Sequence, residues 1–215
     1  MIGLINKIIR RINNSFYSID YWEGRYKSGG NSGSGSYNVL AEHKANFINE
    51  FITRYSVQSA IEFGCGDGNQ LSSINYPSYL GLDVSPTSIS LCKQKFKNDQ
   101  TKKFILYKPS KFNANAIQSH DLSLSLDVIY HLVEDHLFEL HMKHLFQSSS
   151  KYVIIYSSDF ESEQVNHERQ RQFSKWVEKN MRNWELFLKK ESPYKMETDG
   201  SKFSLSDFFV YRKLT

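Results

Sequence analysis

The sequence is short of cysteine and of long apolar runs, and each shortage excludes a class of protein. Two cysteines, Cys65 and Cys92, are too few for a disulfide-stabilised scaffold and fit a reducing compartment. No apolar run approaches the roughly 20 residues that span a membrane. No small-residue cleavage site follows residues 1–9, so we predict no signal peptide, no stable membrane insertion and a cytoplasmic location.

An excess of charge of one sign is also missing. The chain carries 27 basic and 23 acidic residues, a formal net charge of +4, which gives no electrostatic footprint for nucleic-acid binding. Hydrophobic residues make up 40% of the 215 residues and aromatic residues 14%, enough for one well-buried core. The length excludes most two-domain arrangements, and we expect a monomer or a homodimer.

Glycine is scarce too, but it is unevenly placed. Seven of the 11 glycines lie in two short stretches, 29–35 and 64–68. Such clusters are typical of loops whose backbone approaches a ligand closely or adopts positive φ. The first stretch lies in a Ser- and Gly-rich segment, 27–36, with the composition of a linker. Too little chain precedes it to form a domain, so we interpret it as a binding loop.

The isoleucines of residues 1–20 recur at helical spacing, with basic residues between them. A helix of this kind could lie on a membrane surface. We prefer the alternative, a short helix that packs on the rest of the protein.

The hydrophobic pattern beyond this segment predicts an α/β fold in which strands alternate with helices. The last two predicted strands have only about a dozen residues between them, so we expect them to be antiparallel neighbours. Ser85-Pro86 predicts a helix start, with Ser as N-cap and Pro at the first helical position. The other predicted helices are 37–55, 134–146 and 168–181. The predicted strands are 59–63, 79–82, 104–107, 121–129, 152–156, 184–190 and 203–212.

The second glycine cluster follows the first predicted strand and opens a helical turn near 69–74. Its spacing is G-x-G-x-G, and the absence of a following Lys-Ser/Thr pair excludes a P-loop. Asp83 ends the next strand, where a carboxylate can accept both hydroxyls of a ribose. Glu62, the three glycines, Asp83 and Asp127 together indicate a nucleotide-type site at the carboxyl edge of the sheet.

Three segments resemble the motif series of class I S-adenosylmethionine-dependent methyltransferases. They are Glu-Phe-Gly-Cys-Gly-Asp-Gly at 62–68, Gly-Leu-Asp-Val-Ser at 81–85 and Leu-Ser-Leu-Asp-Val-Ile-Tyr-His-Leu at 124–132. The likeness covers residues 20–215. It implies a Rossmann-like sheet of seven strands, mostly parallel with an antiparallel last strand, and helices on both faces. The cofactor residues that it implies are Gly64, Gly66, Gly68 and Glu62, Asp83 on the ribose, and Ser125 and Asp127 at the fourth strand.

One position departs from the family pattern. Many members hold the adenine amine with an acid after the third strand, but Tyr107-Lys108-Pro109 stands there in this sequence. Adenine recognition by backbone groups or by neighbouring side chains therefore stays open.

A narrower resemblance lies in residues 21–36 and in His-x-Arg-x-Arg at 167–171. Both segments are similar to bacterial methyltransferases of capsule and surface-polysaccharide loci, some of which install O-methyl phosphoramidate groups. We expect a small acceptor, a sugar or phosphate-bearing molecule. Arg169 and Arg171 suggest that it is anionic, since arginine suits phosphate or carboxylate recognition. The alternative for 167–171 is a solvated helix start. The candidate substrate residues are Asn31, Ser32, Tyr156, His167, Arg169 and Arg171.

Methyl transfer is an in-line displacement at an activated methyl group, so the protein mainly positions two reactants and excludes water. Arg25 and the backbone N–H groups of 29–33 are candidates for the cofactor's carboxylate. The alternative for Arg25 is a surface ion pair. Trp22 and Tyr26, with neighbouring Tyr21, are candidates to face the sulfonium, whose charge favours an aromatic ring. The alternative for these rings is ordinary core packing.

His131, with its neighbour Tyr130, is the candidate catalytic residue, because it follows the fourth strand where the acceptor should meet the methyl group. An imidazole with a pKa near neutrality can take a proton from a hydroxyl or an amine. The alternative is a structural histidine that caps the next helix. A phosphate-type oxygen is already ionised and would need no base.

Four histidines, at 131, 136, 141 and 144, cluster in the sequence. Only His141 and His144 share a helix face, and no cysteine or His-Glu-x-x-His pattern accompanies them. We therefore predict no metal site.

We expect residues 1–36 to form a helical and loop segment that closes the cofactor site, and residues 37–215 to form a single methyltransferase domain. Methylation of RNA or protein is a second hypothesis, disfavoured by the modest charge and the lack of an appended binding module. A catalytically silent, cofactor-binding scaffold is a third.

Overall fold

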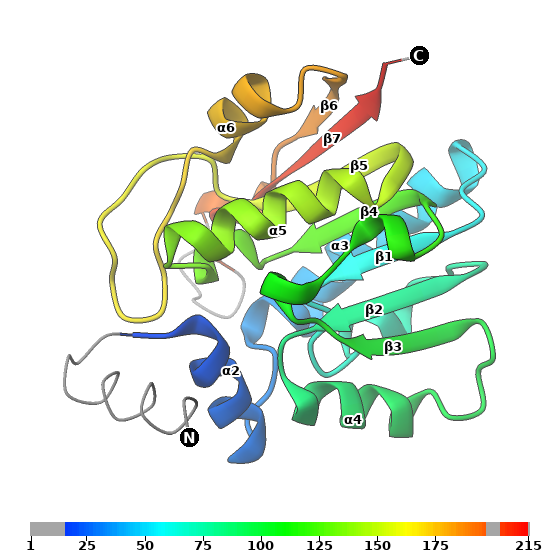
Figure 1. Cartoon of the computed structure of the whole chain (residues 1–215), viewed down its shortest axis with the longest axis vertical. Coiled ribbons are helices and arrows are strands. Elements are labelled where there is room, and N and C mark those ends of the chain that lie inside the picture. Colours follow the sequence, from blue (N-terminus) through cyan, green and yellow to red (C-terminus); the bar gives the residue numbers. More distant parts are fainter. Residues whose placement is uncertain (1–15, 197–202, 215) are drawn as a thin grey trace.

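The computed structural model describes residues 16–196 and 203–214, which contain a seven-stranded sheet of order β3-β2-β1-β4-β5-β7-β6 (Figure 1). The first five strands are mutually parallel, and β7 is antiparallel to both of its neighbours. The predicted fold class is therefore confirmed. The strands are β1 (Ala60–Phe63), β2 (Tyr79–Asp83), β3 (Lys102–Leu106), β4 (His120–Leu126), β5 (Ser149–Ser157), β6 (Trp184–Lys190) and β7 (Asp207–Lys213).

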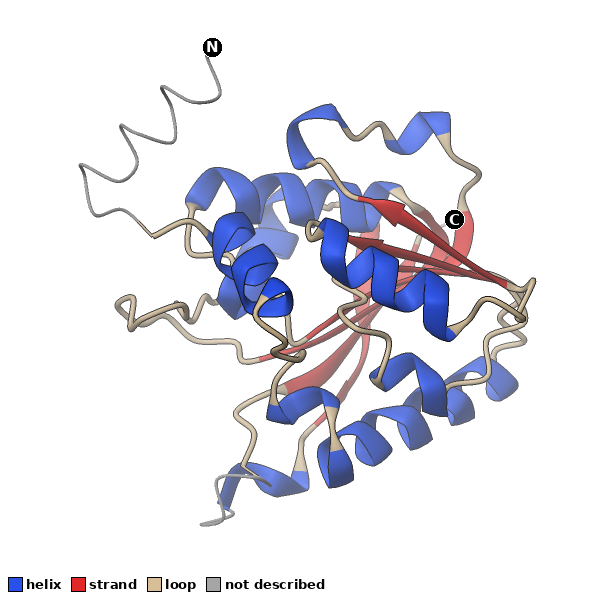
Figure 2. Ribbon diagram, turned by 90° about the horizontal axis from the view of Figure 1, so that it is seen from below, coloured by secondary structure: helices blue, strands red, loops and turns tan. Residues whose placement is uncertain are grey.

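Helices cover both faces of the sheet (Figure 2). The alternation of side chains along β4 shows why: Leu122, Leu124 and Leu126 enter one apolar cluster, whereas the Ser123 hydroxyl on the opposite face donates to the carbonyl of Leu145 at 2.7 Å. The first cluster packs under α3 (Asn38–Arg54) and α4 (Pro86–Lys95), and the second under α5 (Asp135–Gln147) and α6 (Phe173–Asn180).

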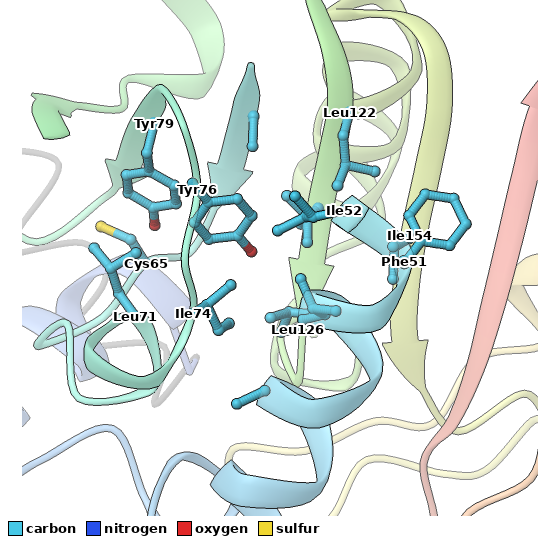
Figure 3. Packing of buried hydrophobic residues seen from close by; sticks show 14 of the residues in the cluster. Phe51, Ile52, Cys65, Leu71, Ile74, Tyr76, Tyr79, Leu122, Leu126 and Ile154 are labelled. Carbon is cyan, nitrogen blue, oxygen red and sulfur yellow. The ribbon is translucent and has the colours of Figure 1, made fainter. Parts of the chain in front are cut away.

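Figure 3 shows the first cluster, where Phe51 and Ile52 of α3 meet Leu122 and Leu126 of β4. The glycine loop is anchored to the same core, because Cys65 is buried in this cluster. Burial of this apolar surface fixes the loop at the carboxyl end of β1.

The predicted start of α4 is confirmed. Pro86 is its first residue, and the hydroxyl of Ser85 accepts a hydrogen bond of 3.0 Å from the backbone N–H of Ser88. This cap places the amino end of α4 directly after Asp83, at the ligand edge of the sheet.

Two predicted boundaries near the site are wrong. The fourth strand ends at Leu126 rather than at residue 129, because Asp127 adopts a left-handed φ of 57° and Ile129–His131 form a 3₁₀ turn, η5. The helix predicted over 168–181 begins only at Phe173. A tight turn precedes it, in which Val165 and Glu168 exchange backbone hydrogen bonds of 2.8 and 3.0 Å.

An unpredicted helix, α2 (Ser18–Lys27), lies beside the carboxyl ends of the strands (Figure 1). It carries Tyr21, Trp22 and Tyr26. The segment that follows contains the 3₁₀ turn η1 (Ser34–Ser36). Most of the helix expected over residues 1–20 lies outside the described residues. The last strand begins at Asp207 rather than at 203. Among the described residues, no helix has the length and apolar character of a membrane span.

Candidate active site

A cavity, here called the donor pocket, lies at the carboxyl ends of β1, β2 and β4 beneath α2. It unites the glycine loop with side chains of α2 and of η5. Its lining includes Trp22, Tyr26, Ser32, Glu62, Gly64, Gly66, Asp67, Gln70, Asp83, Tyr107, Asp127 and His131.

The glycine loop takes the conformation that its sequence predicts. Gly64, Gly66 and Gly68 have φ values of 90°, 56° and 73°, a region that side chains rarely tolerate. The amides of Gly64 and Cys65 both donate to the carbonyl of Leu82, at 2.7 and 3.0 Å. The loop therefore turns sharply against the end of β2, and its opposite side lines the pocket.

Asp83 lies on the pocket floor. Its carboxylate accepts the backbone N–H groups of Gly66 at 3.0 Å and of Ser85 at 2.8 Å, one on each oxygen. Burial raises its pKa above the ordinary value. Each oxygen keeps a second lone pair, so the geometry suits the predicted contact with two ribose hydroxyls.

Glu62 lies one residue before the end of β1, at the same edge of the sheet, and is buried. The hydroxyl of Tyr79 donates to its carboxylate at 2.6 Å. Burial raises the pKa of Glu62 from 4.5 to about 7, against the opposing effect of that hydrogen bond and of Lys44.

Lys44 is a site residue that the sequence reasoning missed. Its side chain is completely buried and forms an ion pair with Asp127, whose other oxygen accepts the hydroxyls of Tyr130 and Ser206, each at 3.1 Å. A signal was present, since Lys44 falls between Leu40 and Phe47 on the apolar face of α3. A lysine on a buried stripe requires a partner.

The segment after α2 packs directly on the glycine loop. The Ser32 hydroxyl accepts the amide of Asp67 at 3.0 Å, and the Ser32 amide donates to the Asp67 carboxylate at 2.9 Å. The hydroxyls of Tyr26 and Ser32 lie 2.9 Å apart. Arg25 holds the same segment from outside, where its Nε donates to the carbonyl of Asn31 at 2.6 Å. Trp22, Tyr26 and Ser32 line the pocket, whereas Arg25 and Asn31 do not.

His131 lies on the pocket wall, edge-on to Trp22 with 4.9 Å between ring centroids, and stacks on His167 at 5.1 Å. Tyr21 also stacks on His167, at 4.6 Å. Burial, and secondarily the charge of His167, lowers the pKa of His131 to about 4. The expectation of a pKa near neutrality is therefore wrong.

Tyr130, Ser125 and Tyr156 are outside the pocket lining. Burial, the largest cause, raises the pKa of Tyr130 well above its ordinary value, and its hydroxyl is committed to Asp127. The Ser125 hydroxyl lies 2.8 Å from Nε2 of His141, on the face covered by α5. Tyr156 is buried beside Phe208, with its hydroxyl 3.1 Å from that of Ser204. Contacts of these three residues with cofactor or substrate stay predictions.

The two arginines of the 167–171 segment converge on Asp135, at 3.0 Å for Arg169 and 2.7 Å for Arg171. Arg171 is buried and also donates to the carbonyls of Leu132 and Val133. The pKa of Asp135 is lowered, and the hydrogen bond from Arg171 is the largest cause. The Arg171 guanidinium is thus occupied in holding the segment to η5, while that of Arg169 remains one-third exposed.

The helix histidines that clustered in the sequence have separate partners. His141 faces Ser125, and Nδ1 of His144 lies 2.7 Å from the hydroxyl of Tyr107. Tyr107 lines the pocket where the family pattern places adenine recognition.

The donor pocket fits S-adenosylmethionine. A Cβ atom on Gly64 would lie 2.4 Å from Val128, so only glycine allows this cradle. The Oε1 atom of Gln70 is buried in the lining without a partner among the described residues, which leaves one acceptor for the cofactor's ammonium group. Trp22 and Tyr26 offer aromatic surface for the sulfonium. When bound, the cofactor would supply an activated methyl group, and these residues would hold it and help to keep water from it.

Comparison with known proteins agrees with this geometry. Residues 61–153 match the family described as a methyltransferase domain. The N-methyltransferase NodS from Bradyrhizobium japonicum WM9, solved with S-adenosyl-L-homocysteine, superposes with a TM-score of 0.67 at 10% identity, covering 91% of this chain and 98% of that one. Magnesium protoporphyrin IX methyltransferase from Synechocystis PCC 6803, solved with the same ligand, gives 0.63 at 13% identity, covering 97% and 99%.

The small RNA methyltransferase HEN1 gives a TM-score of 0.62 at 19% identity over 80% of this chain. The chain covers only 25% of the length of that protein. A search of curated protein sequences gave no match. A methyltransferase-domain family thus matches residues 61–153, and the Rossmann-like sheet that holds this segment supports S-adenosylmethionine-dependent methyl transfer.

Proposed function

We propose that the protein methylates a small, anionic acceptor, a sugar or phosphate-bearing precursor of a surface polysaccharide. The observation that carries this proposal is the cover over the donor pocket. The segment after α2 is held to the glycine loop by the reciprocal hydrogen bonds between Ser32 and Asp67. A covered pocket excludes a folded macromolecule from the methyl group and admits a small one.

The basic side chains near the pocket mouth support an anionic acceptor. Arg25 is close enough to His131 to contribute to the lowering of its pKa, and the guanidinium of Arg169 is partly exposed on the neighbouring segment. Both can attract a phosphate or carboxylate. An acceptor oxygen that is already ionised needs no general base, so we assign His131 the role of orienting the acceptor. We also propose that residues 1–36 close the site on the domain formed by residues 37–215.

The direct test is methyl transfer from radiolabelled S-adenosylmethionine to a panel of sugar phosphates, nucleotide sugars, neutral sugars and RNA. We expect label in the phosphate-bearing compounds and no loss of signal after ribonuclease treatment. At a limiting cofactor concentration the variant Asp83→Asn should strongly lower transfer, whereas the control Asp99→Asn, on the exposed turn before β3, should not.

Label found only in RNA would establish the second hypothesis in place of this one. Tight cofactor binding without transfer to any acceptor of the panel or of a cell extract would indicate a silent scaffold. Transfer to neutral sugars alone would refute the proposal that the acceptor is anionic.

A further inference from the structure

Three potential metal ligands meet at the mouth of the donor pocket. They are His131 at the end of η5 and His167 and Glu168 in the turn before α6, and one ligand atom of each lies within 4.8 Å of the other two. The sequence hid this cluster, because His131 and His167 are 36 residues apart. All three side chains are partly buried, and His131 also lines the pocket.

The hydrogen bond of His131 leaves one ring nitrogen free to bind a metal. Its Nδ1 lies 3.3 Å from the carbonyl oxygen of His167, and since a carbonyl can only accept, Nδ1–H must be the donor. Nε2 then carries the lone pair. Histidines that bind metals commonly donate their other ring N–H to a carbonyl or carboxylate in this way, which fixes the tautomer and the ring orientation.

The backbone ties the two ligand-bearing segments together. The turn that carries His167 and Glu168 is closed by two hydrogen bonds between Val165 and Glu168. The next amide, that of Arg169, donates to the carbonyl of Tyr130 at 2.8 Å, directly beside His131. The ligands therefore sit on a preorganised frame, and the turn needs no rearrangement to present them.

Only a small side-chain movement separates this arrangement from a metal site. Ligand atoms bound to one ion at 2.0–2.2 Å lie at most about 4.4 Å apart, and the three ligand atoms here lie within 4.8 Å of one another. The rings of His131 and His167 are nearly parallel, at 10°, so the His167 ring must turn for both lone pairs to meet at one ion. The side chains of His167 and Glu168 are 29% and 43% exposed, which leaves room for this turn, and their Nε2 and Oε1 atoms are already 3.6 Å apart. Three protein ligands would leave open coordination positions, as in metal sites that bind substrate.

We propose that His131, His167 and Glu168 bind a divalent transition-metal cation. Two imidazoles and one carboxylate suit Zn²⁺, Mn²⁺, Fe²⁺ or Co²⁺. Because His131 lines the donor pocket, the open coordination positions would lie beside it. There they would bind oxygen atoms of the acceptor directly to the ion. This second part rests on the proposed function, because it assumes that the acceptor meets the methyl group beside His131, whereas metal binding itself does not.

Cobalt and manganese ions are suitable probes of the full chain. Titration with Co²⁺ should give the visible absorption of a nitrogen- and oxygen-bound ion, and Mn²⁺ should lose its free-ion electron paramagnetic resonance signal. The variants His167→Ala and Glu168→Gln should each weaken binding by about 10-fold or more. The control His136→Ala removes an exposed histidine of α5 and should bind as the unchanged protein does. Circular dichroism of the metal-free variants would confirm that they are folded.

Absent binding, or equal affinity in the site variants and in the control, would overturn the metal site. Calorimetry with S-adenosyl-L-homocysteine, and transfer with and without a chelator, separate this result from a failure of the proposed function. Transfer that persists without any metal binding would refute this inference and leave the proposed function standing. Metal binding with transfer unaffected by chelation would refute the acceptor contact alone.

Discussion

The buried ion pair between Lys44 and Asp127 offers the sharpest test of the site's architecture. Lys44→Met keeps the length of the side chain and removes its charge, in a position with no exposed surface. Removal of one partner from a buried pair costs about 3–5 kcal/mol, because the other charge is left without compensation. Asp127 would keep the hydroxyls of Tyr130 and Ser206, so we expect the lower end of that range, about 3 kcal/mol.

Asp127→Asn should cost a similar amount, since it leaves the ammonium of Lys44 buried. The double variant removes both charges, and its loss should fall at least about 2 kcal/mol below the sum of the single losses. Urea unfolding followed by circular dichroism measures all three values. The matched control is Lys143→Met, which breaks an exposed pair with Glu139 and should cost under about 1 kcal/mol. Single losses as small as the control's, or strictly additive losses, would refute the buried pair.

Three further predictions concern the donor pocket and its cover. Asp83→Asn should weaken S-adenosyl-L-homocysteine binding by about 2–4 kcal/mol in calorimetry, and unchanged affinity would reject the ribose contact. Gly66→Ala should lower the free energy of unfolding by about 1–2 kcal/mol, because the position has positive φ. The added Cβ would also lie 2.3 Å from the Ser32 hydroxyl. A melting temperature equal to that of the unchanged protein would contradict the packing of the cover. Glu62 has a folded-state pKa raised to about 7 by burial, so the folded state binds its proton more tightly than the unfolded state. Its stabilising contribution is present below about pH 4.5 and is lost as pH rises through about 7, by about 3 kcal/mol. Urea unfolding at pH 5 and pH 8 should show this loss, and Glu62→Gln should reduce it.

Features that depend on neighbours along the chain could be predicted from residue type and spacing. Positive φ at Gly64 and Gly66, the N-cap at Ser85 and the antiparallel pairing of the last two strands are local consequences of residue type and spacing. Asp83 could be placed because the end of a parallel strand always meets the carboxyl edge of the sheet. The residues that line the donor pocket floor were therefore predictable.

Tertiary structure alone decided which distant side chains meet. Lys44 and Asp127 are 83 residues apart, and His131 meets His167 only because the turn after β5 folds back onto η5. The histidines of α5 looked closer to one another in the sequence, yet the packing of that helix turns His141 toward β4. Spacing fixes which residues share a helix face or a strand end, but contacts between elements depend on how the whole sheet and its covering helices pack, and no short stretch of sequence encodes that.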